Sequence, residues 1–167
     1  MASLLKASRS LLGYTVWSNR SQLAALTQIA PEDLVRDTGA SFGSLLWTMG
    51  HVVGTERTWL SRFLGNPLDP APGPETYPDL PALWAAFDEH AAELEFYLAS
   101  LTEDQLDLEV SWTGRTGESR QQKLWQTLLH MVNHSTYHRG QVVTLLRQLG
   151  YQPPASDLTA YYALHPS

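Results

Sequence analysis

The prolines of this chain stand outside the interiors of four long segments whose apolar residues recur at helical spacing. The loop at 66–81 alone holds six of the ten prolines, so we expect it to be stiff. Helices joined by loops bury their apolar faces by packing against one another. The pattern predicts an all-α fold, a four-helix bundle in a single domain at 1–167, with helices at about 2–29, 41–65, 79–101 and 120–149.

Residues that start or stop helices stand at the ends of these segments. Ser41 is the expected N-cap of the second helix, and Gly65 stands where a left-handed glycine would end it. Asp79 is the expected N-cap of the third helix. One further turn of helix can start at Pro31, in the first connector.

The segment at 102–119 is the least regular part of the chain. Leu106, Leu108 and Val110 alternate with acidic residues, which is typical of a strand. A short hairpin that closes at 114–117 is therefore possible between the third and fourth helices. The alternative to a plain bundle is an α-helical array with a small two-stranded flap.

The composition excludes several classes of function. The chain has no cysteine, which rules out disulfides, thiolate metal sites and a thiol nucleophile supplied by the protein. Its net charge of −6 offers no basic field, so we expect no nucleic-acid partner. No run approaches the ~20 apolar residues of a membrane helix, and the N-terminus lacks the pattern of a signal peptide. We expect a cytoplasmic protein with no membrane partner.

Three of the six histidines lie on the fourth predicted helix at intervals of four residues: His130, His134 and His138. Residues four apart share a helix face, so such a pair can direct two imidazoles at one metal ion, although single pairs also occur by chance. On a helical wheel His138 borders the apolar arc, His134 lies about 40° further out, and His130 lies about 40° beyond that. The wheel favours His134 and His138 as the inward pair. His130 is expected beside the ligands or on the plain surface, and Gln141 beside the ligands.

A third imidazole is available on the second predicted helix. His51 shares its face with small and hydroxyl-bearing residues, almost opposite an apolar ridge that begins with Phe42 and Leu45. A solvated face would normally carry Lys and Glu. Gly50 and Gly54 stand beside it, which indicates close helix contact on both sides. His51 is therefore the candidate third ligand, with an exposed histidine as the alternative.

The other polar candidates have ordinary interpretations. His90 is expected to pack at the edge of the third helix, and His165 to be free in the C-terminal tail. Glu56 and Arg139 both fall on the apolar sides of their helices. A buried ion pair between them is an alternative to an ordinary structural role.

Two segments closely resemble the DinB (damage-inducible) family, also described as DinB/YfiT-like metalloenzymes. They are SFGSLLWTMGHVVGTERTWL at 41–60 and LLHMVNHSTYHRGQVVTLLRQLG at 128–150. The resemblance extends over nearly the whole chain. It implies a four-helix bundle, commonly dimeric, that holds a metal ion with one histidine of the second helix and an HxxxH pair of the fourth. Those positions here are His51, His134 and His138, so we expect one divalent ion, zinc or nickel, in a homodimer.

Three imidazoles leave open positions on such an ion for water or a substrate, as in catalytic zinc sites. The metalloprotease motif HExxH is absent, because Ser135 stands where that motif has its general-base glutamate. The Glu-x-x-His motif of di-iron bundles is absent too, because Met131 and Ser135 stand three residues before the paired histidines. These patterns assign no catalytic side chain beyond the candidate ligands.

The resemblance implies a metal-dependent thiol S-transferase, since some relatives use a low-molecular-weight thiol such as bacillithiol, mycothiol or glutathione. A chain without cysteine is compatible with a thiol brought in from outside. The expected substrates are small electrophilic molecules. Two alternatives remain: a metal-dependent hydrolase, and a non-enzymatic, stress-induced metal-binding dimer.

Overall fold

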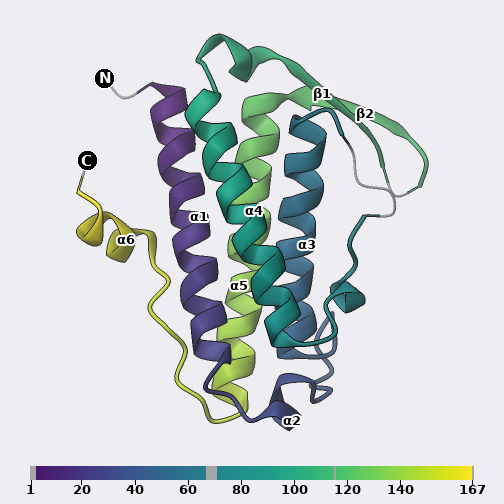
Figure 1. Ribbon diagram of the computed structural model, residues 1–167, viewed down its shortest axis with the longest axis vertical. Coiled ribbons are helices and arrows are strands. Elements are labelled where there is room, and N and C mark those ends of the chain that lie inside the picture. Colours follow the sequence, from purple (N-terminus) through teal and green to yellow (C-terminus); the bar gives the residue numbers. More distant parts are fainter. Residues whose placement is uncertain (1–2, 67–70, 115, 167) are drawn as a thin grey trace.

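Four long helices run side by side along the molecule (Figure 1). The computed structural model describes residues 3–66, 71–114 and 116–166. The long helices are α1 (Leu4–Leu26), α3 (Leu45–Phe63), α4 (Leu80–Ser100) and α5 (Leu124–Gln148). The expected all-α four-helix bundle is confirmed. No described helix combines the length and hydrophobicity that a membrane span requires.

The prediction that Ser41 caps the second long helix is wrong. Ser44 is the N-cap of α3, and its hydroxyl oxygen accepts a hydrogen bond from the Trp47 backbone N–H at 3.3 Å. Just before it the chain turns, with Gly43 at a φ of 76° and the Thr38 N–H bonded to the Gly43 carbonyl at 2.7 Å. A residue in the left-handed region cannot belong to a right-handed helix, so α3 starts only after this turn.

The other helix ends follow the sequence more closely. Gly65 has a φ of 77° and ends α3 as expected. Asp79 caps α4, with its carboxylate accepting from the Ala82 N–H at 2.8 Å. The short helix α2 (Pro31–Leu34) begins at the expected proline. The first long helix is shorter than expected, because α1 ends at Leu26 and its C-cap is Thr27.

A hairpin joins the third and fourth long helices, as the alternating pattern indicated. After a 3-10 turn, η2 (Asp104–Asp107), strand β1 (Glu109–Thr113) pairs antiparallel with β2 (Ser119–Lys123). The predicted start of the last helix near Arg120 is wrong, since α5 begins at Leu124. The run at 119–123 is entirely polar, so it has nothing to bury in the bundle, and its backbone pairs with β1 instead. Position 115 of the expected turn falls outside the described residues.

The proline-rich loop packs on α3 at Gly50 and Gly54. The sequence analysis expected a neighbouring helix to make this close contact. Its described part includes the 3-10 turn η1 (Pro74–Thr76); positions 67–70 are not among the described residues. A Cβ atom on Gly50 would lie 2.6 Å from the Pro74 carbonyl oxygen, and one on Gly54 would lie 2.8 Å from that of Pro72. The two glycines thus allow the loop backbone to contact the helix. The close contact exists, but the loop makes it.

The core consists of two apolar clusters stacked along the bundle with a buried polar layer between them. The cluster at the α2 end includes Leu26, Met49, Leu83 and Leu146. The cluster at the hairpin end includes Leu12, Leu60, Leu94 and Leu128. The polar layer takes residues from all four long helices, namely Asn19, Glu56, His90, Ser135 and Arg139, each at most 2% exposed. At the C-terminal end, α6 (Leu158–Leu164) packs against α1.

Candidate metal centre

His51 of α3 comes together with His134 and His138 of α5 where these two helices pack side by side. One nitrogen of each ring lies within 4.8 Å of one nitrogen of each of the others. The ring centroids are 4.9 Å (51–134), 4.5 Å (51–138) and 4.4 Å (134–138) apart. Among the described residues, no other group of three or more His, Cys, Asp or Glu side chains could hold a metal ion.

Helical spacing accounts for this arrangement. The four-residue interval places His134 and His138 on one face of α5, and that face meets α3. His51 reaches across from α3, so that its Nε2 lies 3.1 Å from Nε2 of His134. The structure therefore brings together the same three imidazoles that the sequence pattern selected.

The sequence analysis missed an aromatic wall of this cluster. Phe42 stacks on the His51 ring at a centroid distance of 3.9 Å and an interplanar angle of 22°, and it meets the His138 ring edge-on at 5.4 Å. The helical wheel had placed Phe42 almost opposite His51. That wheel fails here because Phe42 precedes α3 and lies in the turn around Gly43. The Tyr137 ring also meets the His138 ring edge-on, at a centroid distance of 5.0 Å.

Gln141 contacts the cluster through His138. Its Oε1 lies 2.8 Å from the Nδ1 of His138. A carbonyl oxygen can only accept, so Nδ1 carries the proton and donates it, which leaves the lone pair of a neutral imidazole on Nε2. This contact fixes both the tautomer and the ring orientation of His138, which is the usual second role of a residue beside a metal-binding histidine.

His134 is held in its neutral form. Burial, together with the nearby imidazoles of His138 and His130, lowers its pKa to about 4 against the opposing effect of the Glu56 carboxylate. Its Nδ1 is buried and has no hydrogen-bond partner among the described residues. A neutral imidazole is the form that binds metal ions.

The other histidines lie apart from this cluster. His130 is exposed; its ring is 5.9 Å from that of His134 and packs on Trp59 at 5.3 Å. His165 was expected to be free, but it stacks on Tyr161 at 4.4 Å, with its Nδ1 3.0 Å from the Tyr161 carbonyl oxygen. The reason is α6, which contains Tyr161 and has His165 as its C-cap.

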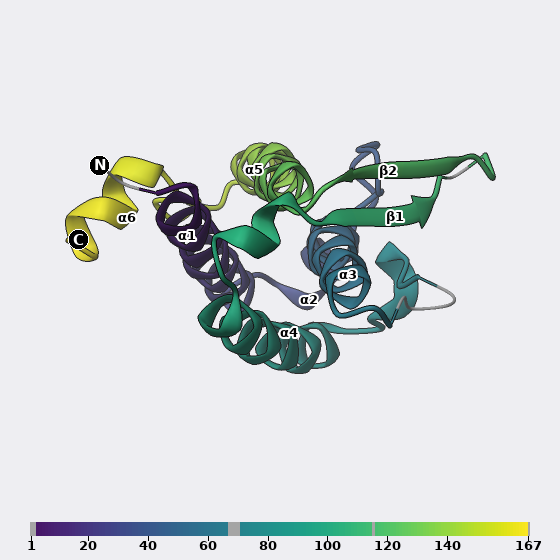
Figure 2. The ribbon, with the colours of Figure 1, turned by 90° about the horizontal axis from the view of Figure 1, so that it is seen from above.

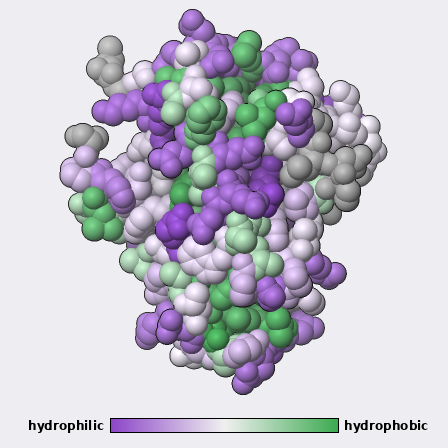
Figure 3. Space-filling model, in the orientation of Figure 1, coloured by the Kyte–Doolittle hydropathy of each residue, from purple (hydrophilic) through white to green (hydrophobic). Residues whose placement is uncertain are grey.

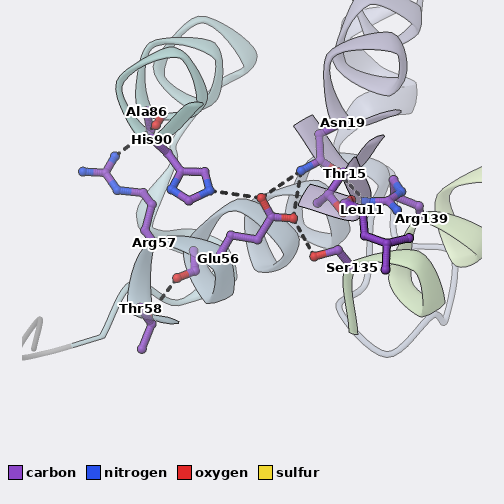
Figure 4. Close-up of polar contacts among 11 residues, drawn as sticks. Leu11, Thr15, Asn19, Glu56, Arg57, Thr58, Ala86, His90, Ser135 and Arg139 are labelled. Carbon is purple, nitrogen blue, oxygen red and sulfur yellow. Dashed lines mark hydrogen bonds and ion pairs between the residues drawn. The ribbon is translucent and has the colours of Figure 1, made fainter. Parts of the chain in front are cut away.

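A second polar cluster lies in the buried layer of the core (Figure 4). The Glu56 carboxylate accepts from the Asn19 side-chain amide at 2.9 Å and from the Ser135 hydroxyl at 2.5 Å. His90, expected at a helix edge, is instead buried, with its Nε2 3.2 Å from Glu56 Oε2. Burial raises the pKa of Glu56, but the contacts with His90, Ser135 and Asn19 outweigh burial and lower it overall.

Asn19 stands between Glu56 and Arg139, so the ion pair considered from the sequence is indirect. Arg139 donates through Nη1 to Asn19 Oδ1 and through Nη2 to the Thr136 hydroxyl, both at 2.9 Å, and its guanidinium lies 5.1 Å above the Tyr14 ring. One signal of this network was available in the sequence. Asn19 stands on the apolar ridge of α1, where a polar residue needs buried partners.

The sequence as a whole matches a known family. The sequence model of the DinB family matches residues 1–166. The chain belongs to the DinB family. It is 26% identical over 165 residues to Protein DinB of Bacillus subtilis strain 168, an alignment that covers 90% of this chain and 91% of that protein. The resemblance identified from the two histidine-bearing segments is confirmed.

A solved structure supports the same fold. The crystal structure of a DinB-like protein from Bacillus cereus ATCC 10987 superposes with a TM-score of 0.60 at 20% identity. The match covers 87% of this DinB-family chain and 94% of that chain. At this identity the likeness shows a shared fold, including the arrangement of the long helices that carry the histidine cluster.

Proposed function

We propose that this DinB-family protein binds one divalent metal ion through His51, His134 and His138 and transfers an external thiol to small electrophilic molecules. The observation that carries the proposal is the convergence of three imidazole nitrogens within 4.8 Å of one another. Three protein ligands leave positions open on a zinc-like ion, which is typical of catalytic rather than structural sites.

The geometry of the cluster fits such an ion. Zinc–nitrogen bonds of about 2.0–2.1 Å in a tetrahedral site place two ligand nitrogens about 3.3 Å apart, and the Nε2 atoms of His51 and His134 are 3.1 Å apart. The contact from Gln141 leaves Nε2 of His138 as its ligand atom. An all-imidazole set suits zinc and nickel, so these are the metals we propose.

The side chains around the cluster would prepare it for thiol chemistry. A divalent ion held by three neutral ligands supplies a positive charge that lowers the pKa of a bound thiol and so favours the nucleophilic thiolate. Burial keeps His134 neutral, and the Phe42 ring covers one face of the His51 ring. Because the chain has no cysteine, the thiol must be a separate small molecule, such as bacillithiol, mycothiol or glutathione.

The hydrolase alternative has less support. A metal-dependent hydrolase commonly needs a carboxylate as general base, and no carboxylate belongs to the histidine cluster among the described residues. Glu56, the buried carboxylate of α3, already makes hydrogen-bond contacts with Asn19, Ser135 and His90 in the core. Thiol transfer would require no such base, because a divalent ion held by the three histidines would lower the pKa of a bound thiol.

We also propose that the protein forms a homodimer through α1 and α6. These helices expose apolar side chains, including Leu4 (40%), Tyr162 (45%) and Leu164 (65%). The face around α4 is a poorer candidate, since a hydrophilic band there separates hydrophobic patches (Figure 3). Light scattering should give twice the chain mass of 18.7 kDa; the mass of one chain at micromolar concentration would contradict the dimer.

The transferase is tested by initial rates of conjugation between each of the three thiols and a panel of electrophiles. We expect activity in metal-loaded protein, and its loss after chelation or in His138→Ala. The matched control is His165→Ala, at the exposed C-cap of α6, which should keep the wild-type rate. Circular dichroism verifies that each variant is folded. Equal rates in all samples would contradict the transferase and support non-enzymatic metal binding, whereas thiol-independent ester or amide cleavage would indicate the hydrolase.

A further inference from the structure

A cavity of about 420 Å³ lies where the hairpin meets α3 and α5. The hairpin contributes Trp112, Arg120, Gln121 and Gln122 to its lining, α3 contributes Trp59, and α5 contributes His130. The metal centre proposed above does not include any of these residues. The cavity is therefore a separate space on the same pair of helices.

The inner face of β2 overhangs this cavity instead of packing on the bundle. In the antiparallel register Val110 stands opposite Gln122, and Trp112 stands opposite Arg120, so these four side chains share one face of the hairpin. The β1 members of that face are partly buried, but Arg120 and Gln122 are exposed. Figure 2 shows the hairpin projecting outward past α3 and α5. The space under β2 is thus kept open.

The lining combines aromatic surface with a cation. The rings of Trp59 and Trp112 meet at a centroid distance of 5.0 Å and an angle of 73°, which forms an apolar corner. Arg120 contacts Glu118 through Nη2, and a guanidinium has further N–H donors. None of the described residues that line the cavity carries a carboxylate. Such a lining favours a planar apolar body with a negative group.

His130 connects this cavity with the histidine cluster. Its ring contacts Trp59 at 5.3 Å on the cavity side, and it lies 5.9 Å from the His134 ring on the other. One helical turn of α5 separates the two sites. A small molecule packed against the Trp59–Trp112 corner would therefore lie about one helical turn of α5 from the proposed metal centre.

We propose that this cavity is the subsite for the electrophilic substrate and that it takes an aromatic or other planar carboxylate. The flat body packs on Trp59 and Trp112, and the carboxylate pairs with Arg120. The identification of the ligand as an electrophile rests on the proposed function. The binding of an aromatic carboxylate does not rest on that function, because none of the lining residues is a proposed metal ligand.

The test uses 1-naphthoate as the probe and 1-naphthylmethanol as its uncharged counterpart. Binding is followed by the indole N–H signals in nitrogen-15 NMR spectra of metal-loaded and chelated protein, assigned with Trp59→Phe and Trp112→Phe. We expect naphthoate to shift the signals of these two indoles, with or without metal, and to bind about tenfold more tightly than the alcohol. Arg120→Gln should remove that preference.

Two further variants distinguish the loss of the Arg120 charge from a disturbance of the hairpin fold. Arg147→Gln, an exposed change on α5 outside the cavity, should bind naphthoate as the wild type does. Arg120→Lys should keep part of the preference if Arg120→Gln disturbs the hairpin. Absence of shifts in both indoles at millimolar naphthoate would overturn the subsite. Loss of binding on chelation would overturn it too, since the probe would then be a metal ligand. Binding that depends on Arg120 without any thiol transfer would keep the subsite and contradict the proposed function.

Discussion

Helices α3 and α5 carry two polar clusters of opposite character. At their partly exposed contact, the imidazoles of His51, His134 and His138 turn their nitrogens toward one another. In the core, the Glu56 carboxylate receives hydrogen bonds from donors on the neighbouring helices (Figure 4). His134 and Ser135 are adjacent in sequence, yet they belong to different clusters, because successive residues of a helix point about 100° apart.

The two clusters differ in whether their acceptor atoms all have hydrogen-bond donors within the protein. In the core, each oxygen of Glu56 faces a donor, so the carboxylate needs no further partner, while Nδ1 of His90 and Nε of Arg139 have no hydrogen-bond partner among the described residues. In the histidine cluster, two Nε2 atoms lie 3.1 Å apart, and only one of them can donate. The first arrangement holds helices together, and in the second a cation would take the place of the hydrogen between the two Nε2 atoms. Variants of the core cluster should therefore change the stability of the fold, and variants of the histidine cluster should change metal affinity.

The largest expected effect is that of Glu56→Ala on stability. Removing the carboxylate leaves Asn19, Ser135 and His90 with unpaired buried polar groups, so the free energy of unfolding should fall by about 3–5 kcal/mol. Urea unfolding of the metal-free protein measures this. The comparison variant is His138→Ala, which should cost less than about 1 kcal/mol because the site is partly exposed. Equal costs for the two variants would contradict the proposed division of roles.

Gln141→Ala should have an effect of intermediate size. It should weaken metal binding and leave the stability of the metal-free protein unchanged. Without the contact to Nδ1, the His138 ring loses its fixed tautomer and orientation. Losses of this kind weaken metal binding by about 10–100-fold. Competition with a chromogenic chelator measures the affinity, and urea unfolding of the metal-free variant should match the wild type. An unchanged affinity would show that the contact does not position the ligand.

The smallest expected effect is a change in the pH dependence of stability. The pKa of Glu56 is lowered in the folded chain, because the hydrogen bonds it accepts outweigh the opposing effect of burial. Its ionised form therefore stabilises the fold above pH 4.5, the ordinary value, and this contribution is lost as the pH falls through the folded pKa. Glu56→Gln should flatten the stability profile below pH 4.5. Parallel profiles for wild type and variant would refute the assignment.

Local patterns predicted the parts of this structure that depend on one helix at a time. The four-residue interval identified His134 and His138, and Gly65 and Asp79 marked helix ends correctly. The turn before α3 was missed, and the hairpin was anticipated but its second strand was assigned to the last helix. Phe42 lies against His51 because the turn at Gly43 precedes α3, and the polar run 119–123 becomes a strand only because β1 pairs with it. The Glu56 network required the packing of four helices, which no single helical wheel contains.

The central claim is that one metal ion is held by His51, His134 and His138, and the most direct test is a count of bound metal. Wild-type protein and single alanine variants of these histidines and of His130 would be loaded with zinc or nickel, dialysed at neutral pH and analysed for metal per chain. We predict one ion per chain in the wild type and in His130→Ala, and almost none in the other three. Loss of the ion in His130→Ala with retention in His134→Ala would contradict the account.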